Sequence, residues 1–187
     1  MKLYFIAGKA RHGKDTLAEK MKSEYEKRGQ KTCIVHISSH IKQLVREYFG
    51  WDGQDETKPR TLLQQLGTDI VRVQMNRPLF WITRTLEDLD ILAHFFDVAI
   101  LADVRLPQEI ESIRAYDADA VSIHIVRADF ESPLSAAEQQ HATEVGLDHY
   151  DFTYDYEIVN TTLDQLERDA IQVIEEEGTN NEKNDKQ

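Results

Sequence analysis

Short apolar runs alternate along the chain with longer segments in which apolar residues recur every three or four positions. Apolar runs with β-branched residues predict strands, here at residues 3–7, 31–37, 98–103, 120–126 and 156–159. The periodic segments predict helices at 14–28, 41–48 (with Ser39 as its cap), 60–73, 78–94, after Pro107, and at 163–174. Strands that alternate with helices predict an α/β fold, with a parallel sheet covered on both faces.

Two segments do not follow this alternation. Residues 128–148 are polar, show little periodicity and contain no lysine or arginine, which predicts a mobile excursion. Residues 178–187 are hydrophilic throughout and are expected to form a disordered tail. We therefore expect a single domain over residues 1–177.

Composition narrows the function classes. The chain has 187 residues and a net charge of −12, without a basic cluster, which argues against binding to nucleic acid. It contains no run of about 18 apolar residues, so we expect no membrane span. Cys33 is the only cysteine, and the first apolar run is too short for a signal peptide. These features favour the reducing cytoplasm.

The stretch "GKARHGKDT" (8–16) has the spacing of a phosphate-binding loop, Gly8-x4-Gly13-Lys14, between an apolar run and an amphipathic helix. In such loops backbone N–H groups surround phosphate oxygens, the helix N-terminus adds its dipole, and the lysine reaches the β/γ-phosphates. We expect the nucleotide to be bound by Gly8, Ala10, Arg11, His12, Gly13, Lys14, Asp15 and Thr16, with Arg127 after the fourth strand.

Asp15 stands where this loop usually carries a hydroxyl that contacts Mg²⁺. A carboxylate can also serve a hard cation, directly or through water. The alternative is that Asp15 only balances the positive end of the helix dipole.

Asp103 ends an apolar run and is the second expected contributor to a Mg²⁺ site. Because the carboxyl ends of parallel strands share one edge of the sheet, Gly8, Asp103 and Arg127 are expected to face one cleft. A helix-capping role for Asp103 is the alternative.

The phosphate-loop text resembles that of the deoxynucleoside monophosphate kinases of bacteriophage type, in which the Gly-Lys-Asp-Thr ending is familiar. The similarity continues through residues 48–72, 80–84 ("FWITR"), 102–114 ("ADVRLPQEIESIR") and 141–160 ("HATEVGLDHYDFTYDYEIVN"). This resemblance implies a three-layer P-loop kinase sandwich with a five-stranded parallel sheet. It also implies a helical monophosphate-binding region at 38–96 and a lid at 128–148.

The resemblance implies phosphoryl transfer from ATP, with Mg²⁺ near Asp15 and Asp103, to a (deoxy)nucleoside monophosphate. Lys14, Asp15, Asp103 and Arg105 would be catalytic. Arg105 would bind the transferred group, unless it instead forms an ion pair with Glu109. The residues expected near the acceptor, beside Gln64 and Thr68, are Trp51, Gln65, Asp69, Arg72, Arg84, Arg105, His141 and Glu144. Small nucleotides are the expected partners, and a homodimer is compatible with these residues.

Other functions stay open from the residues alone. The acceptor could be dephospho-coenzyme A or phosphomevalonate, whose kinases share the general plan. A nucleotide-dependent switch or ATPase would bind the triphosphate without transfer, although the Asn-Lys-x-Asp guanine motif of Ras-type GTPases is absent from the sequence. A nucleic-acid-dependent ATPase is disfavoured by the net charge of −12.

Overall fold

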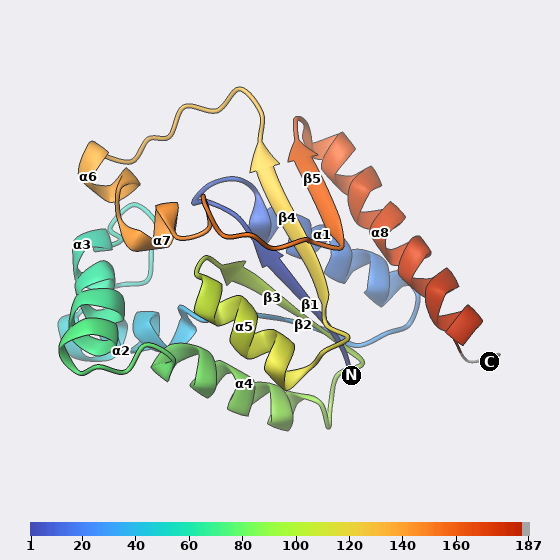
Figure 1. Ribbon diagram of the computed structural model, residues 1–187, viewed down its shortest axis with the longest axis horizontal. Coiled ribbons are helices and arrows are strands. Elements are labelled where there is room, and N and C mark those ends of the chain that lie inside the picture. The colour runs from blue at the N-terminus through green and yellow to red at the C-terminus, as the bar shows by residue number, and fades with distance from the viewer. Residues whose placement is uncertain (185–187) are drawn as a thin grey trace.

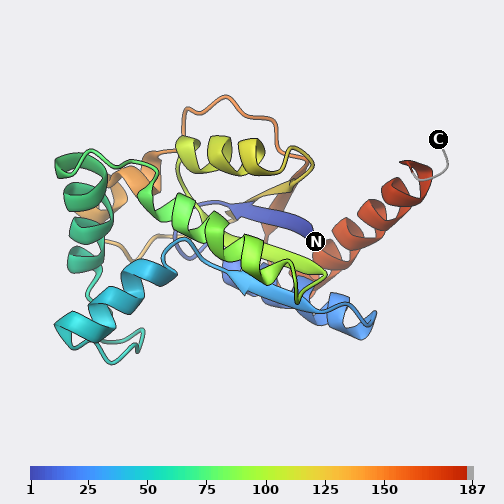
Figure 2. The same ribbon diagram turned by 90° about the horizontal axis from the view of Figure 1, so that it is seen from below.

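The computed structural model describes residues 1–184 and places a five-stranded sheet between two layers of helices (Figures 1 and 2). The strand order is β2-β3-β1-β4-β5, and every pair of neighbours is parallel. The strands are β1 (Lys2–Ala7), β2 (Thr32–Val35), β3 (Val98–Val104), β4 (Val121–Arg127) and β5 (Tyr156–Asn160). The predicted α/β fold with a five-stranded parallel sheet is confirmed.

Alternate side chains of β1 enter two separate cores. Tyr4 and Ile6 pack against α1 (Lys14–Lys27) and α8 (Leu163–Asn184). Leu3 and Phe5 face the opposite layer, formed mainly by α4 (Phe80–Leu92) and α5 (Pro107–Tyr116). All four side chains are at most 2% exposed, as expected for a central parallel strand.

The remaining helices gather at the carboxyl ends of the strands (Figure 1). They are α2 (Ser39–Phe49), α3 (Arg60–Gln64), the π-helix η1 (Gln65–Gln74), α6 (Ala136–Gln139) and α7 (Ala142–Val145). Because these helices lie at the carboxyl ends of the strands, the residues that end the strands face a second, mainly helical part of the chain.

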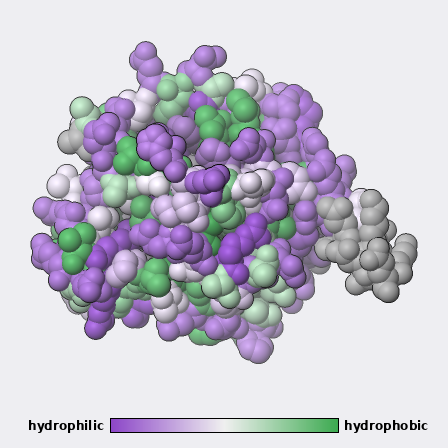
Figure 3. Space-filling view, viewed as in Figure 1, coloured by the Kyte–Doolittle hydropathy of each residue, from purple (hydrophilic) through white to green (hydrophobic). Residues whose placement is uncertain are grey.

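Hydrophilic side chains cover most of the face of the molecule shown in Figure 3.

The helix predicted at 60–73 is present, but it changes its hydrogen-bond pattern. It starts as α3 and continues from Gln65 as a π-helix. The indole N–H of Trp81 donates to the carbonyl oxygen of Gly67 at 3.1 Å. An outside donor on a helix carbonyl disturbs the regular i→i+4 ladder, which is where π-turns form.

Three boundary predictions differ from the structure. Ser39 is the first residue of α2 and Ser38 precedes it, so Ser39 is not the cap. The segment 128–148 contains two single-turn helices, α6 and α7. The tail predicted at 178–187 is wrong for residues 178–184, because α8 continues to Asn184. The preceding turns of α8 are anchored in the core and carry Glu175, Glu176 and Glu177, which favour helix, so the helix continues from an already formed segment. Residues 185–187 lie outside the described residues.

Within residues 1–184, none of the helices is long and apolar enough to cross a membrane.

Candidate active site

The phosphate loop needs its two glycines for steric reasons. Gly8 has φ 150° and Gly13 has φ 103°. A Cβ atom on Gly8 would lie 2.5 Å from the carbonyl oxygen of Ile125, and one on Gly13 would lie 2.4 Å from Nδ2 of Asn160. At Gly8 the obstacle is backbone, so no larger residue fits. At Gly13 it is the end of a side chain, and the positive φ is what strains any other residue.

Lys14 reaches back over this loop. Its side-chain nitrogen donates to the carbonyl oxygens of Gly8 and Lys9, each at 2.7 Å. The residue is 4% exposed. Burial, reinforced by the nearby charge of Arg105, lowers the pKa of Lys14 to about 7. Its ammonium group is thus held in place by two carbonyls in a poorly solvated position, where an anion would stabilise its charge strongly.

Two cavities meet at Lys14, Asp15 and Arg105, which line both. The first, the helical-side cavity, has a volume of about 200 Å³ and lies between the phosphate loop, α2, α3, η1 and the 128–148 segment. The second, the loop-side cavity, has a volume of about 540 Å³; its other lining residues are Arg11, Gly13, Thr16, Arg127, Asn160, Thr161, Thr162 and Leu163. Ala10 and His12 belong to the same loop.

The two predicted metal carboxylates both line the helical-side cavity. Oδ1 of Asp15 lies 2.8 Å from Nε2 of His36, and this hydrogen bond is the main reason that the pKa of Asp15 lies below its ordinary value. Asp103 accepts the backbone N–H groups of Ile37 at 2.7 Å and Ser38 at 3.0 Å. Asp103 therefore ties β3 to the start of α2, so it has a capping role as well as a place in the cavity.

These carboxylates fit Mg²⁺ in the way that nucleotide-binding proteins hold it. No group of three His, Cys, Asp or Glu side chains with metal-ligand geometry occurs in the described part of the chain. Mg²⁺ bound with a nucleotide, however, takes only one or two carboxylates, and phosphates and water complete its shell. A carboxylate offers about four lone-pair sites, so Asp103 still has acceptor capacity beyond its two N–H partners.

Arg105 and Glu144 join the 128–148 segment to the phosphate loop. Nη1 of Arg105 forms an ion pair with one oxygen of Glu144. The other oxygen accepts the backbone N–H of Ala10 at 2.9 Å. Glu144 is 8% exposed, so this contact is shielded from water. The position of Glu144 thus supports the expectation that it belongs to the site, and its partner is the backbone of the phosphate loop at Ala10.

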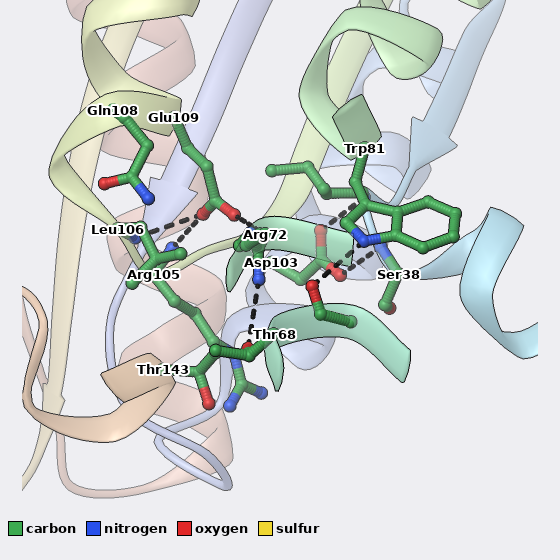
Figure 4. Close-up of polar contacts among 12 residues, drawn as sticks. Ser38, Thr68, Arg72, Trp81, Asp103, Arg105, Leu106, Gln108, Glu109 and Thr143 are labelled. Atoms are coloured by element: carbon green, nitrogen blue, oxygen red, sulfur yellow. Dashed lines mark hydrogen bonds and ion pairs between the residues drawn. The ribbon is translucent and has the colours of Figure 1, made fainter. Parts of the chain in front are cut away.

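Arg72 forms a buried ion pair with Glu109 at the back of the helical-side cavity (Figure 4). Its Nη2 lies 2.7 Å from Oε1 of Glu109, and the two side chains are 9% and 5% exposed. The alternative in which Glu109 pairs with the side chain of Arg105 is wrong. Glu109 accepts the backbone N–H of Arg105 instead, at 2.9 Å.

Several predicted acceptor residues do not line either cavity: Trp51, Gln65, Asp69, Arg84 and His141. Gln65 and Asp69 are exposed, whereas Gln64 and Thr68 line the helical-side cavity. One residue along a helix rotates the side chain by about 100°, so of these four residues only Gln64 and Thr68 point to the cavity.

The other three have local partners. The guanidinium of Arg84 lies 5.3 Å from the centroid of the Phe80 ring. The indole of Trp51 donates to the carbonyl oxygen of Gln54 at 3.1 Å. Nδ1 of His141 accepts the backbone N–H of Thr143 at 3.3 Å and thereby caps α7. The structure therefore gives each of them a role outside the cavities.

Further polar residues contribute to the two cavities. Lys42 and Arg60, two cations of the predicted monophosphate-binding region, line the helical-side cavity, and so does Lys58, which the sequence did not single out. Asn160 follows the apolar part of β5 and donates to the carbonyl oxygen of His12 at 3.0 Å. A polar residue that ends an apolar strand is the signal that pointed to Asp103, and the same signal at Asn160 could have found it.

Comparison with known proteins gives two curated relatives. A segment of 89 residues is 36% identical to the deoxynucleotide monophosphate kinase of Escherichia phage RB69, and it covers 47% of this chain and 33% of that protein. A segment of 95 residues is 33% identical to the deoxynucleotide monophosphate kinase of Enterobacteria phage T4, covering 50% of this chain and 36% of the relative. The matches thus span about a third of the relatives' length.

Solved structures support the fold. The APS kinase of Mycobacterium tuberculosis in complex with AMPPNP and APS is 13% identical, with a TM-score of 0.58 over 93% of this chain and 97% of that chain. Shikimate kinase from Aquifex aeolicus is 10% identical, with a TM-score of 0.50 over 96% of this chain and 99% of that chain. At these identities the likeness concerns the fold alone.

A family model covers most of the chain. Residues 25–169 match the one described as deoxynucleotide monophosphate kinase. The match starts after the phosphate loop at residues 8–16, so the spacing of that loop is a separate observation that agrees with a kinase family. The chain belongs to the deoxynucleotide monophosphate kinase family.

Proposed function

We propose that this chain transfers the terminal phosphoryl group of ATP to a deoxynucleoside monophosphate. The bond from phosphorus to the ADP oxygen breaks, and a bond to an oxygen of the monophosphate forms. The observation that carries this proposal is the meeting of two cavities at Lys14, Asp15 and Arg105. Such an arrangement suits a reaction that depends on positioning and charge neutralisation.

The loop-side cavity is the proposed ATP site. Backbone N–H groups of the phosphate loop and the N-terminus of α1 would bind the phosphates, and Lys14 would neutralise the transferred group. Arg127 lies at the outer side, where its guanidinium is 4.7 Å from the centroid of the Phe130 ring and is available to the nucleotide. An arginine in this position can stack on a base or bind two phosphate oxygens.

The helical-side cavity is the proposed monophosphate site. Arg72, Lys42, Lys58 and Arg60 supply its positive charge, and Arg105 stands between the two nucleotides. From the 128–148 segment the cavity receives Leu134, Glu138, Thr143 and Glu144, but no cation, because this segment contains none. The proposed lid would therefore exclude water, and the charge would be met by residues of the core.

Mg²⁺ would be held by Asp15 and Asp103 together with the nucleotide. It would supply charge neutralisation on the phosphate oxygens. His36 would keep Asp15 oriented, and the Ile37 and Ser38 amides would do the same for Asp103. Residues 1–177 would act as one domain, on small nucleotides in the cytoplasm.

The test is ADP formation from ATP and Mg²⁺ with one candidate acceptor at a time. The acceptors are the common deoxynucleoside monophosphates, dephospho-coenzyme A and phosphomevalonate, with an acceptor-free control. At least one deoxynucleoside monophosphate should stimulate ADP formation and be recovered as the diphosphate. ATP hydrolysis that no acceptor stimulates, or transfer only to another acceptor, would overturn the proposal.

A further inference from the structure

We propose that Glu109 is a positioning residue for the acceptor, because a single buried carboxylate fixes the Arg72 side chain and the backbone that carries Arg105. This inference rests on the proposed function. It assigns a role to a residue that lies at the back of the helical-side cavity, behind the arginines that would contact the phosphate.

The carboxylate of Glu109 has three N–H partners (Figure 4). Oε1 accepts from Nη2 of Arg72 at 2.7 Å. Oε2 accepts from the backbone N–H groups of Arg105 at 2.9 Å and Leu106 at 3.1 Å. Glu109 itself is 4% exposed. The two oxygens thus divide their partners between two distant parts of the chain.

The backbone contacts explain why a glutamate suits this position. Glu109 is in the first turn of α5, after Pro107 at its start. An acidic side chain there satisfies free N–H groups and interacts well with the helix dipole. Capping, however, uses only Oε2. The contact from Oε1 to Arg72 goes beyond what the helix requires.

Arg72 depends on that contact for its charge and its direction. Burial lowers the pKa of Arg72, and the charge of Glu109 opposes this effect. The other terminal nitrogen of Arg72, Nη1, makes only a long contact of 3.4 Å to Oγ1 of Thr68. Its Nε has no hydrogen-bond partner among the described residues. Glu109 is thus the only strong anchor that we find for Arg72 in residues 1–184, and the guanidinium keeps unused donors beside the cavity.

Arg105 depends on Glu109 through its main chain. Oε2 holds the N–H groups of Arg105 and of the next residue, so it fixes the turn between β3 and α5. The two arginines approach the cavity from different elements, and the same carboxylate sets their relative position. Planar guanidinium groups bind phosphate well only when their donors are correctly oriented.

The first variant is Glu109→Gln, which keeps the shape and one acceptor oxygen but removes the charge. We expect KM for the monophosphate to rise at least about 10-fold, a loss of about 1.4 kcal/mol, while KM for ATP changes by less than about 2-fold. Glu111→Gln is the matched control, because Glu111 is exposed on the same helix and lines neither cavity. It should leave both constants unchanged.

The second variant is Glu109→Asp, which separates positioning from capping. Aspartate keeps the negative charge near the helix N-terminus but is shorter by one methylene, so it cannot reach Arg72 and the two amides together. Positioning predicts a raised KM for the monophosphate here too, whereas a capping role alone predicts wild-type constants. This variant retains the charge balance of the buried pair, so it also serves if Glu109→Gln folds poorly.

Equal changes of both KM values, or a wild-type KM for the monophosphate in Glu109→Asp, would overturn the inference. Failure of the proposed function looks different. There the wild-type protein forms no ADP in response to any deoxynucleoside monophosphate, and the inference fails with it. An active wild type with an unaltered acceptor KM in both variants rejects the role of Glu109 alone.

Discussion

The phosphate loop differs in construction from the wall of the helical-side cavity, by which we mean Arg72, Asp103 and Glu109. In the loop, Lys14 contacts carbonyls only five and six residues away, and two glycines shape the backbone. In the wall, side chains meet across long separations: 37 residues for Arg72 and Glu109, and 66 for Asp103 and Ile37. A substitution in the wall therefore removes a tertiary contact, whereas a substitution in the loop changes local charge.

This difference separates two kinds of mutational effect. Wall residues should matter for stability, because each removed partner leaves a buried polar group without its hydrogen bond. Lys14 should matter mainly for turnover. Burial disfavours its charged form, as its lowered pKa shows, so the charge of Lys14 contributes little to the stability of the fold.

The largest expected effect on stability comes from Arg72→Met. Removing the guanidinium leaves the charge of Glu109 buried without a partner, which typically costs about 3–5 kcal/mol. Urea unfolding measures the loss. Arg72→Met combined with Glu109→Gln should recover part of it, because the buried charge is then absent while the amide oxygen can still accept the N–H groups of Arg105 and Leu106. A single variant within about 1 kcal/mol of wild type would show that the wall is less dependent on this pair than its burial indicates.

Lys14→Met should separate turnover from stability. We expect kcat to fall at least about 10²-fold, the scale of a removed electrostatic contact in the transition state. The free energy of unfolding should fall by no more than about 1 kcal/mol, because losing the contacts to the Gly8 and Lys9 carbonyls is offset when an apolar chain of similar length replaces a buried amine with a lowered pKa. Lys20→Met, at a partly exposed ion pair with Glu167 away from both cavities, is the control. Normal turnover in Lys14→Met would contradict the assignment of this loop as the ATP site.

Asp103→Asn should have an intermediate effect on stability. The amide offers one acceptor oxygen where the carboxylate offers two, so one of the N–H groups of Ile37 and Ser38 loses its partner. The expected loss is about 1–3 kcal/mol in urea unfolding. An unchanged midpoint and slope would mean that these amides find other partners, and the wall would then be more adaptable than the comparison holds.

Glu109 should leave a pH signature in stability. Burial raises its pKa to about 6, so the folded protein binds this proton more tightly than the unfolded chain. The stability that this adds is fully present below about pH 4.5 and is lost as the pH rises through about 6. Relative to Glu109→Gln, wild type should therefore lose unfolding free energy between these values. A difference that stays constant across this range contradicts the raised pKa.

The smallest effect is expected at Asp15. Its side chain is 78% exposed, so Asp15→Ala should hardly change stability. We expect instead a few-fold rise in the Mg²⁺ concentration that gives half-maximal rate, and Asp15→Ser should restore part of the original value. An identical Mg²⁺ dependence in both variants and wild type would leave Asp15 with a role at the helix N-terminus only.

The same contrast explains what the sequence could predict. The strands and the phosphate loop follow from local patterns, because apolar runs, glycine spacing and Lys14 act within a few residues. The sequence does not show which of Gln64, Gln65, Thr68 and Asp69 line the cavity, since the phase of a helix is fixed by its tertiary packing, here by Trp81 on Gly67. Likewise, no local sequence pattern predicts the ion pair between Glu109 and Arg72, because the two residues are 37 positions apart.

Arg11 shows how selection can act in two directions on one residue. Its φ of 61° lies in the left-handed region, which costs an L-residue about 1–2 kcal/mol, and its side chain lines the loop-side cavity. Selection for thermal stability alone would favour glycine at this position, which adopts such a conformation readily. Under the proposed function, the charge of Arg11 would offset this cost by binding nucleotide phosphates in the loop-side cavity. A directed-evolution experiment that rewards heat resistance without rewarding turnover should therefore accumulate substitutions at Arg11 early, and the loss of nucleotide affinity would follow as a by-product.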